Sequence, residues 1–252
     1  MMKSILTSIP ALVAGFLIGC GSGDSGSGDS EGGASVTTSP AAGIWEGTGV
    51  TSKNDSGEIA GLIASNGKAM FVSDLPAVIS GDVSVTGSTF RLNGTTFSDE
   101  APAAITMSGI VTPGVSITAN YSMPDENGTI SLLKADASIG VYDRPSNLAK
   151  LQGVWNDSTS PSEGTWVFNI QGNGAFSAIR VLDNCTMNGT FTTIDSTKNE
   201  YATTATISSC DDFNGDYTGL AFTSDANSFT DNVVNIIITS SRHAGVFEAT
   251  KQ

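Results

Sequence analysis

The feature of this sequence that most restricts its fold is a long internal repeat. The segment "GIWEGT" begins at Gly43, and "GVWNDS" begins at Gly153. Each is followed by two strand-like runs that meet at an Asn-Gly pair, "GEIAGLIASNGKAMFVSD" at 57–74 and "GTWVFNIQGNGAFSAIRVLD" at 164–183. A period of this length indicates a tandem duplication, so we expect two domains with one fold.

Finer details support the same alignment. The pairs Asn66-Gly67 and Asn173-Gly174 are typical of tight hairpins, in which both central residues take positive φ angles. Next, "VISGDVSV" at 78–85 parallels "TMNGTFTT" at 186–193, with a glycine at the fourth place in both. The two halves therefore share the order of their turns as well as their first tryptophan.

Each half contains eight short runs rich in Val, Ile, Thr and Phe. In the first half they lie at 43–51, 57–65, 68–73, 77–86, 89–98, 103–112, 114–122 and 128–139; in the second they lie at 153–157, 164–171, 175–182, 185–194, 200–208, 216–223, 232–240 and 243–250. Only 14% of the residues are charged, and 29 are glycine, which is the profile of an all-β protein with many turns. We therefore predict two tandem small antiparallel β-barrels of about eight strands each, with β-sandwiches as the alternative.

The chain divides into five segments on this interpretation. Between the halves, Leu148 and Leu151 follow a proline at helical spacing, which predicts one short helical turn that packs between the domains. The predicted segments are a signal peptide at 1–19, a flexible Gly/Ser-rich tether at 20–42, a first barrel at 43–141, a linker at 142–152 and a second barrel at 153–252.

The leader has a basic residue, Lys3, and an apolar stretch that is too short to span a bilayer and has the length of a signal-peptide core. It ends in Leu17-Ile18-Gly19-Cys20, which resembles the bacterial lipobox. The resemblance implies cleavage before Cys20 and acylation of its thiol. Gly21 takes the place of the aspartate that is associated in some bacteria with inner-membrane retention, which favours the outer membrane. The expected localisation is thus the cell envelope, with the protein held by its N-terminal lipid.

The tether at 20–42 lacks apolar periodicity. A flexible segment of this length has a typical end-to-end span of about 26 Å. Because several acyl chains hold a lipoprotein firmly, the fold itself need not touch the bilayer. Anchoring and function are therefore expected to be separate.

The Gly-x-Trp motif at the first strand of each half, Gly43 with Trp45 and Gly153 with Trp155, resembles the opening of lipocalins and streptavidin-type barrels. This resemblance implies that each indole plugs one end of its barrel. An immunoglobulin-like domain would place its tryptophan on the third strand instead. By the residues alone, Trp45 and Trp155 are expected to be core residues, since a large indole usually packs.

Two cysteines remain after Cys20, and an exported protein is expected to join Cys185 to Cys210. Their midpoint falls in the polar stretch "STKN" at 196–199, so we predict that they face each other directly across a hairpin ladder. The bridge is expected to be structural and to stabilise the second domain by about 3.5 kcal/mol. No Cys-x-x-Cys motif indicates redox activity.

The search for chemistry yields no catalytic motif. The single histidine, His243, is interpreted as a surface or barrel-rim residue, because no second histidine or nucleophile motif accompanies it. Asp212, Asn214 and Asp216 alternate like the start of a calcium loop, but the sixth place is not glycine and the twelfth is not glutamate. A hairpin turn at Asn214-Gly215 explains these residues more simply, with weak calcium binding as the alternative. No metal and no cofactor are expected.

The formal net charge of −14 argues against nucleic-acid binding, because a surface this negative repels phosphate backbones. The chain as a whole resembles tandemly duplicated bacterial lipoproteins. We expect a binding or structural module of the cell envelope, with either a small apolar ligand inside an open barrel or a protein or glycan partner on the outside of a filled one. The alternative from another class is an envelope hydrolase that uses two carboxylates.

Overall fold

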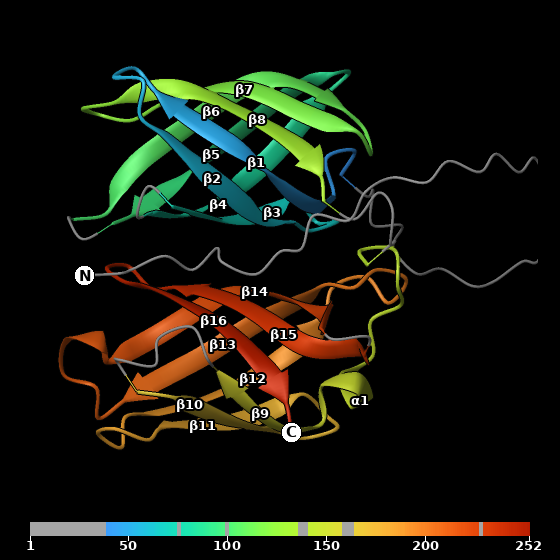
Figure 1. Ribbon diagram of the computed structural model, residues 1–252, viewed down its shortest axis with the longest axis vertical. Helices are drawn as coiled ribbons and strands as arrows, with labels where there is room; N and C mark the ends of the chain where they lie inside the picture. The colour runs from blue at the N-terminus through green and yellow to red at the C-terminus, as the bar shows by residue number, and fades with distance from the viewer. Residues whose placement is uncertain (1–38, 75–76, 99–100, 136–140, 158–163, 227–228) are drawn as a thin grey trace, which may run out of the picture.

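The computed structural model describes residues 39–74, 77–98, 101–135, 141–157, 164–226 and 229–252, and shows two closed eight-stranded antiparallel barrels (Figure 1). The predicted all-β architecture of two tandem barrels is confirmed. The signal peptide at 1–19, Cys20 and most of the tether at 20–42 lie outside the described residues.

Each barrel is an up-and-down meander in which neighbouring strands in the sequence are neighbours in the wall. In barrel 1 the first strand pairs with the eighth, and in barrel 2 the ninth pairs with the sixteenth. Barrel 1 comprises β1 (Gly43–Thr51), β2 (Ser56–Ile63), β3 (Lys68–Ser73), β4 (Ala77–Thr86), β5 (Thr89–Phe97), β6 (Ala103–Thr112), β7 (Ser116–Ser122) and β8 (Asn127–Lys134). Barrel 2 comprises β9 (Gly153–Asp157), β10 (Trp166–Ile170), β11 (Ala175–Arg180), β12 (Thr186–Thr193), β13 (Tyr201–Ser208), β14 (Gly215–Ala226), β15 (Phe229–Thr239) and β16 (Ala244–Lys251).

The alternation of side chains along each strand explains why the walls close around a core. In β7, Ile117, Ala119 and Tyr121 are buried, while the residues between them are exposed and polar. Inward-facing residues of this kind form one apolar cluster inside each barrel. The largest fully buried side chains of these clusters are Trp45, Phe71, Phe90 and Leu92 in barrel 1, and Trp155, Phe168, Phe191 and Tyr201 in barrel 2.

The glycine shared by the two halves at the fourth place marks a close approach of strands. A Cβ added to Gly81 would lie 2.6 Å from the carbonyl oxygen of Asn93, and one added to Gly189 would lie 2.1 Å from that of Thr204. Because backbone oxygens cannot give way, glycine is required where the wall bends. This equivalence supports the alignment of the two halves.

The Asn-Gly hairpins differ from the prediction in their turn type. Gly67 and Gly174 have positive φ angles of 83° and 86°, but neither preceding asparagine does. Instead, the amide oxygen of Asn66 accepts a hydrogen bond from the Lys68 N–H, at 3.1 Å. The loops are thus four-residue connections that need a positive φ only at glycine, and the asparagine serves as a hydrogen-bond acceptor.

The Cys185–Cys210 disulfide is confirmed, with 4.8 Å between the Cα atoms, but the predicted register is wrong by one residue. The β12–β13 ladder pairs Thr186 with Ser208, so Cys185 and Cys210 both lie just beyond it. Regular alternation would point Cys210 away from the barrel interior. The positive φ of Ser209, 60°, turns the chain so that both cysteines are buried in the core.

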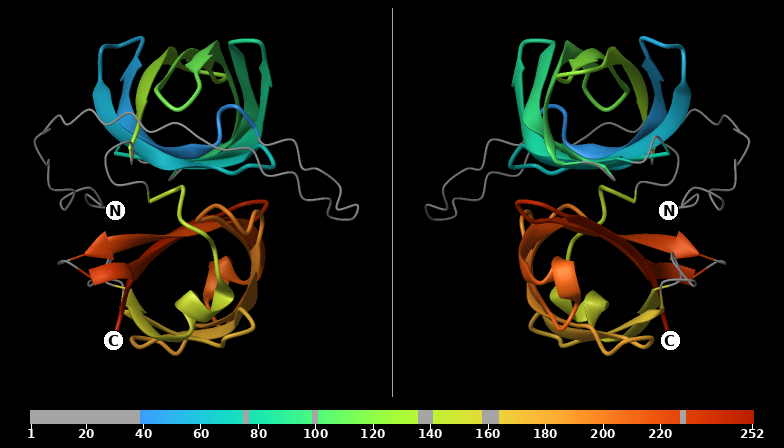
Figure 2. Two further views of the ribbon diagram at one scale, coloured as in Figure 1. Left: turned by 90° about the vertical axis from the view of Figure 1, so that its right-hand side faces the viewer. Right: turned by 90° about the vertical axis from the view of Figure 1, so that its left-hand side faces the viewer.

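The two barrels pack wall against wall (Figure 2). We call this contact the joint. On barrel 1 it uses outward residues of the β1–β5 wall, and on barrel 2 it uses residues of β14 and β15. Its buried residues are Ile44, Leu62, Ala64, Met70, Val78 and Phe97 from barrel 1, Val141 and Tyr142 from the segment between the last strand of barrel 1 and α1, and Leu220 and Ile237 from barrel 2.

The linker differs from its prediction in what its helix covers. The helix α1 (Leu148–Leu151) does not pack between the barrels, because Leu151 belongs to the core of barrel 2. Instead, the segment before it fills the space between the domains with Val141 and Tyr142. The side chain of Asn199 fixes this segment, since its amide donates to the carbonyl oxygens of Val141 and Thr223, at 3.1 and 2.7 Å.

Candidate functional site

The two predicted plug residues occupy equivalent places in the two barrels. The indole N–H of Trp45 donates to the carbonyl oxygen of Ala41 at 2.9 Å, and that of Trp155 donates to the carbonyl oxygen of Leu151 at 2.7 Å. Both rings are fully buried. Each tryptophan therefore ties the segment before its barrel to the interior, and we call this side of each barrel the plug end.

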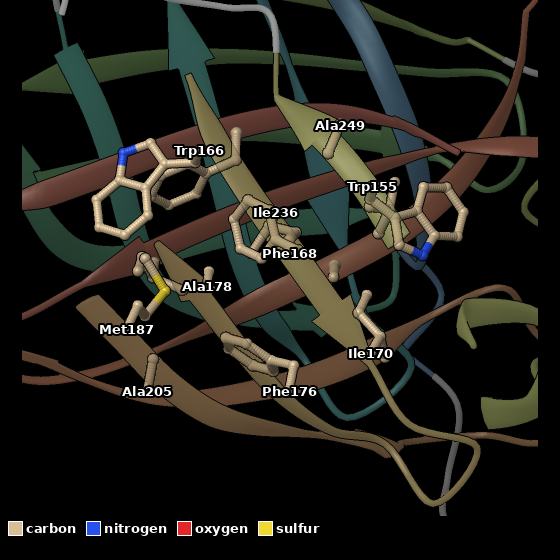
Figure 3. Packing of buried hydrophobic residues seen from close by; sticks show 14 of the residues in the cluster. Trp155, Trp166, Phe168, Ile170, Phe176, Ala178, Met187, Ala205, Ile236 and Ala249 are labelled. Carbon is tan, nitrogen blue, oxygen red and sulfur yellow. The ribbon is translucent and has the colours of Figure 1, made fainter. Parts of the chain in front are cut away.

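The opposite end of barrel 2 is closed by a second tryptophan, Trp166, which lies across the core from Trp155 (Figure 3). The guanidinium of Arg180 lies 5.7 Å from the centroid of the Trp166 ring. Asp183 holds this guanidinium through two hydrogen bonds, at 3.0 and 2.5 Å. Barrel 2 is thus covered at both ends by large side chains.

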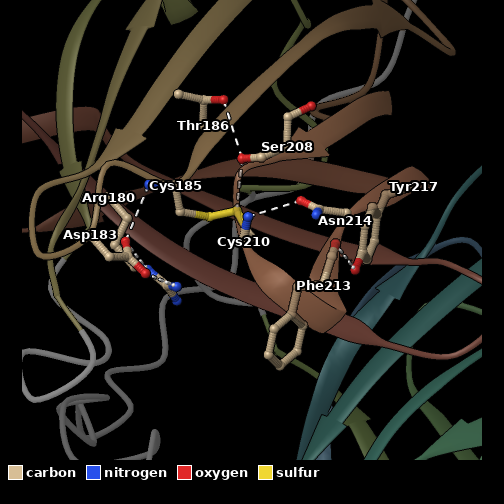
Figure 4. Close-up of a disulfide and its surroundings, with 9 residues drawn as sticks. All are labelled: Arg180, Asp183, Cys185, Thr186, Ser208, Cys210, Phe213, Asn214 and Tyr217. Carbon is tan, nitrogen blue, oxygen red and sulfur yellow. Dashed lines mark hydrogen bonds and ion pairs between the residues drawn. A yellow bond between two sulfur atoms is a disulfide. The ribbon is translucent and has the colours of Figure 1, made fainter.

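The disulfide lies at this same end and ties together the loops that follow β11 and β13 (Figure 4). The short 3₁₀ helix η1 (Asp211–Phe213) follows directly after Cys210. The N–H of Cys210 donates to the side-chain oxygen of Asn214 at 2.9 Å, which fixes the turn. Two loops that are distant in the sequence are therefore held as one rigid surface, which we call the loop end.

Large apolar side chains are exposed on both sides of this disulfide. Val181, Leu182 and Phe213 expose 63%, 70% and 48% of their surface. The ring of Phe213 packs on that of His243, with 4.8 Å between the centroids. The interpretation of His243 as a rim residue agrees with this position, because the histidine lies in the turn between β15 and β16. Exposed apolar residues held on a rigid frame are typical of a contact surface for another molecule.

The loop end is also acidic. Asp211, Asp212 and Asp216 are exposed, and none of them forms an ion pair with a described residue. The Thr206 hydroxyl donates to the carboxylate of Asp216 at 2.7 Å. Apolar residues therefore stand beside carboxylates that have no cationic partner in the part of the chain that the structure describes.

Two residues of the possible calcium site, Asn214 and Asp216, form hydrogen bonds with different parts of the fold. Asn214 caps the turn after Cys210, and Asp216 accepts from Thr206 on the neighbouring strand. The expected tight turn at Asn214-Gly215 is replaced by η1, since Asn214 is extended with φ −60° and ψ 136°. Across the described ranges, no group of three or more His, Cys, Asp or Glu side chains is placed to hold a metal ion.

One pair of neighbouring carboxylates bears on the hydrolase alternative. Asp157 at the end of β9 is buried and accepts the backbone N–H of Glu248 at 3.2 Å. Partial burial and the nearby charge of Asp157 raise the pKa of Glu248. However, the alternation of side chains along β9 points Asp157 to the barrel interior, as it does Trp155, whereas Glu248 is on the exposed face of β16. The two carboxyl groups therefore do not face each other across a shared cleft.

The plug ends and the loop end lie on opposite sides of the molecule. The N–H of Ser39 donates to the carbonyl oxygen of Ser65, so the chain enters barrel 1 at its plug end. Ser65 also contacts Glu200 in the loop between β12 and β13, which lies at the plug end of barrel 2. Figure 1 shows the start of barrel 1 and α1 on one side, away from the hairpins of the loop end.

Sequence reasoning found the disulfide and the burial of both first-strand tryptophans but missed the apolar side chains of the loop end. The sequence does indicate the loop end, because apolar residues stand in its turns: "VLDN" before Cys185 and "DDFNG" after Cys210. The sequence places Trp166 in a strand and does not indicate that its side chain closes an end of the barrel. The β12–β13 connection at 194–200 is longer than the equivalent turn of barrel 1 at 87–88. This difference in length is the sequence feature that indicates extra residues at the joint.

Comparison of the chain with protein-family models, with curated proteins and with solved structures found no match. Among the described residues, no helix has the length and the apolar character needed to cross a membrane.

Proposed function

We propose that this chain is a lipid-anchored binding module of the bacterial cell envelope, and that its loop end binds a protein partner with a basic surface. The lipobox-like Leu17-Ile18-Gly19-Cys20 supports the anchor, Gly21 after it favours the outer membrane, and the tether at 20–42 would supply the distance from the bilayer. The observation that carries the binding proposal is the loop end itself, where exposed Val181, Leu182 and Phe213 stand on a disulfide-held frame.

Two further features favour binding on the outside. Both barrel interiors are filled by large buried side chains, which argues against an internal site for a small apolar ligand. The carboxylates of Asp211, Asp212 and Asp216 complement a basic partner and would steer it toward the apolar residues. Because residues 39–42 enter barrel 1 at its plug end, the loop end lies on the side opposite to this entry point and would be accessible to a partner.

A photo-cross-linking residue in place of Leu182, in the full-length protein in its own cells, tests this proposal. The matched control is the same residue in place of Ile110 on barrel 1, which is also apolar and 62% exposed. We expect a discrete protein adduct from position 182 and none from position 110. The adduct should weaken at high salt and in the double variant Asp211→Asn, Asp212→Asn, because charge attraction is screened or removed.

Three results would contradict the binding half of the proposal. These are equal adducts at both positions, an adduct that is insensitive to the double variant, and retention on envelope glycans in place of any protein adduct. The anchor is tested separately by metabolic labelling with a fatty acid. The label should be incorporated into the native protein and absent from the Cys20→Ser variant.

A further inference from the structure

A carboxylate is buried in the joint between the two barrels. Glu200, at the end of the β12–β13 loop, is 0% exposed. Three donors surround it, and they come from outside its own barrel. The N–H of Ser65 in barrel 1 donates to Oε2 at 2.9 Å, the Ser65 hydroxyl donates to Oε1, and the hydroxyl of the linker residue Tyr142 donates to Oε2 at 2.8 Å. This side chain therefore links barrel 1, the linker and barrel 2.

No lysine or arginine among the described residues forms an ion pair with Glu200. The charged group that acts on it directly is Asp195 on its own loop. Asp143 of the linker acts on the neighbouring Tyr142 and is held by Lys134 and Lys198, at 3.2 and 2.7 Å. The β2–β3 turn of barrel 1 contributes Ser65, and the Lys68 that follows it is paired with Asp82. The two nearby lysines thus neutralise Asp143 and leave the buried charge of Glu200 without a cation.

We propose that Glu200 makes the joint sensitive to pH, so that acidification tightens the packing of the two barrels and a rise in pH loosens it. Opening the joint would hydrate this carboxyl group, whereas closing it removes the group from water. The orientation of barrel 2, and with it of the loop end, relative to barrel 1 would then respond to the acidity of the surroundings. This inference concerns the joint alone and does not depend on what the loop end binds.

The direction follows from the balance of the surrounding effects. Burial raises the pKa of Glu200 more than the hydrogen bonds from Ser65 and Tyr142 lower it, and Asp195 raises it further. Burial and the neighbouring acidic groups also raise the pKa of Tyr142, which keeps its hydroxyl protonated and able to donate. A group with a raised pKa in the closed state stabilises that state at low pH, and this contribution is lost as the pH rises through its pKa.

Hydrogen exchange of the Ser65 amide in the full chain measures the joint directly, because this N–H donates to Glu200. After correction for the intrinsic pH dependence of exchange, we expect its protection to fall by up to about tenfold per pH unit over the interval in which Glu200 titrates, since one proton is linked to opening. The Glu200→Gln variant carries no titrating proton at this site, so its corrected protection should be independent of pH in that interval.

The matched control is Glu126→Gln. Glu126 accepts from the hydroxyl of Tyr121 at 2.7 Å in a similar Tyr–Glu pair, but it lies in barrel 1 and away from the joint. This variant should keep the pH dependence of the wild type at Ser65. The inference is overturned if wild type and Glu200→Gln show the same pH dependence, or if protection rises with pH. If Glu200→Gln opens the joint at every pH, the Tyr142→Phe variant, which keeps Glu200, provides the second test and must retain the wild-type direction.

Discussion

The same wall of the repeat is buried in one barrel and exposed in the other. Barrel 1 packs outward residues of β1 to β5 into the joint, whereas among the described residues none of the equivalent strands β9 to β13 contributes to it. Aligned on the tryptophans, the Asn-Gly turns and the strand register, Leu62 corresponds to Asn169 and Met70 corresponds to Ser177. These two apolar residues of the joint are therefore replaced by polar ones where the wall lies outside it.

The reverse holds for the other side of the joint. Leu220 and Ile237 of barrel 2 are buried, and their counterparts on the free β6–β7 wall of barrel 1 are Ser108 and Asn120. The two halves thus meet through different faces, a head-to-tail contact that would propagate if both faces were apolar in both barrels. The polar residues at these positions make the free faces less suited than the joint to packing against a further barrel.

Exchanging residues between these equivalent positions should have the largest effect. The double variant Leu220→Ser, Ile237→Asn gives barrel 2 the residues of the free wall. We expect it to weaken the joint by about 4 kcal/mol or more, because each lost side chain costs about 2–5 kcal/mol and leaves polar groups facing an apolar surface. Small-angle scattering should show a larger radius of gyration while both barrels keep their circular dichroism.

The reciprocal variant, Ser108→Leu with Asn120→Ile, serves as the control. It changes a wall outside the joint, so the radius of gyration at low concentration should match that of the wild type. If both double variants behaved alike, the side chains of the joint would not determine the packing of the barrels.

The second difference between the barrels is the disulfide, which only barrel 2 possesses among the described residues. Replacing Cys185 and Cys210 by alanine should lower the stability of barrel 2 by about 3.5 kcal/mol, since the loop closure no longer restricts the unfolded chain. Hydrogen exchange of the full chain should show lost protection in β12 and β13 but not in β4 and β5, their counterparts. Equal losses in both barrels would contradict independent stabilisation.

The smallest effect is expected at Thr203, which is buried on β13 and has a hydroxyl without a hydrogen-bond partner. Its counterpart in barrel 1 is Leu92, which pairs with Val83, whereas Thr203 pairs with the larger Phe191. Thr203→Val should stabilise barrel 2 by about 1 kcal/mol, because an unsatisfied polar group is removed at constant shape. Denaturant unfolding measures this change, and a loss of stability would mean that the hydroxyl is satisfied in solution.

The strands were predictable because alternation, turn residues and the repeat all indicated one architecture. The pairing of β1 with β8 could be inferred as well, because an up-and-down barrel closes by pairing its first strand with its last. By contrast, the joint was not foreseen, since Leu62 and Ile63 are adjacent apolar residues in one strand and their two faces cannot be assigned without the partner. Glu200 was equally hidden, because its burial depends on Ser65, which is distant in the sequence.

The candidate site was only partly predictable for a related reason. Cysteine spacing gave the bridge, and the error of one residue in its register came from the left-handed conformation of Ser209, which no pattern signals. Phe213 lies in a turn, where an apolar side chain can equally be buried or exposed. Its exposure depends on η1, which replaced the expected tight turn.

The way each barrel closes also sets an order of assembly. Barrel 1 is complete once β8 has paired with β1 through seven residue pairs, from Trp45↔Lys134 to Thr51↔Gly128. Barrel 2 cannot close until β16 reaches β9, and that seam has three pairs, from Ala249↔Asp157 to Lys251↔Trp155. A chain emerging from its N-terminal end therefore offers a finished apolar wall on barrel 1 before barrel 2 exists. The first barrel can act as an internal template on which the second one folds.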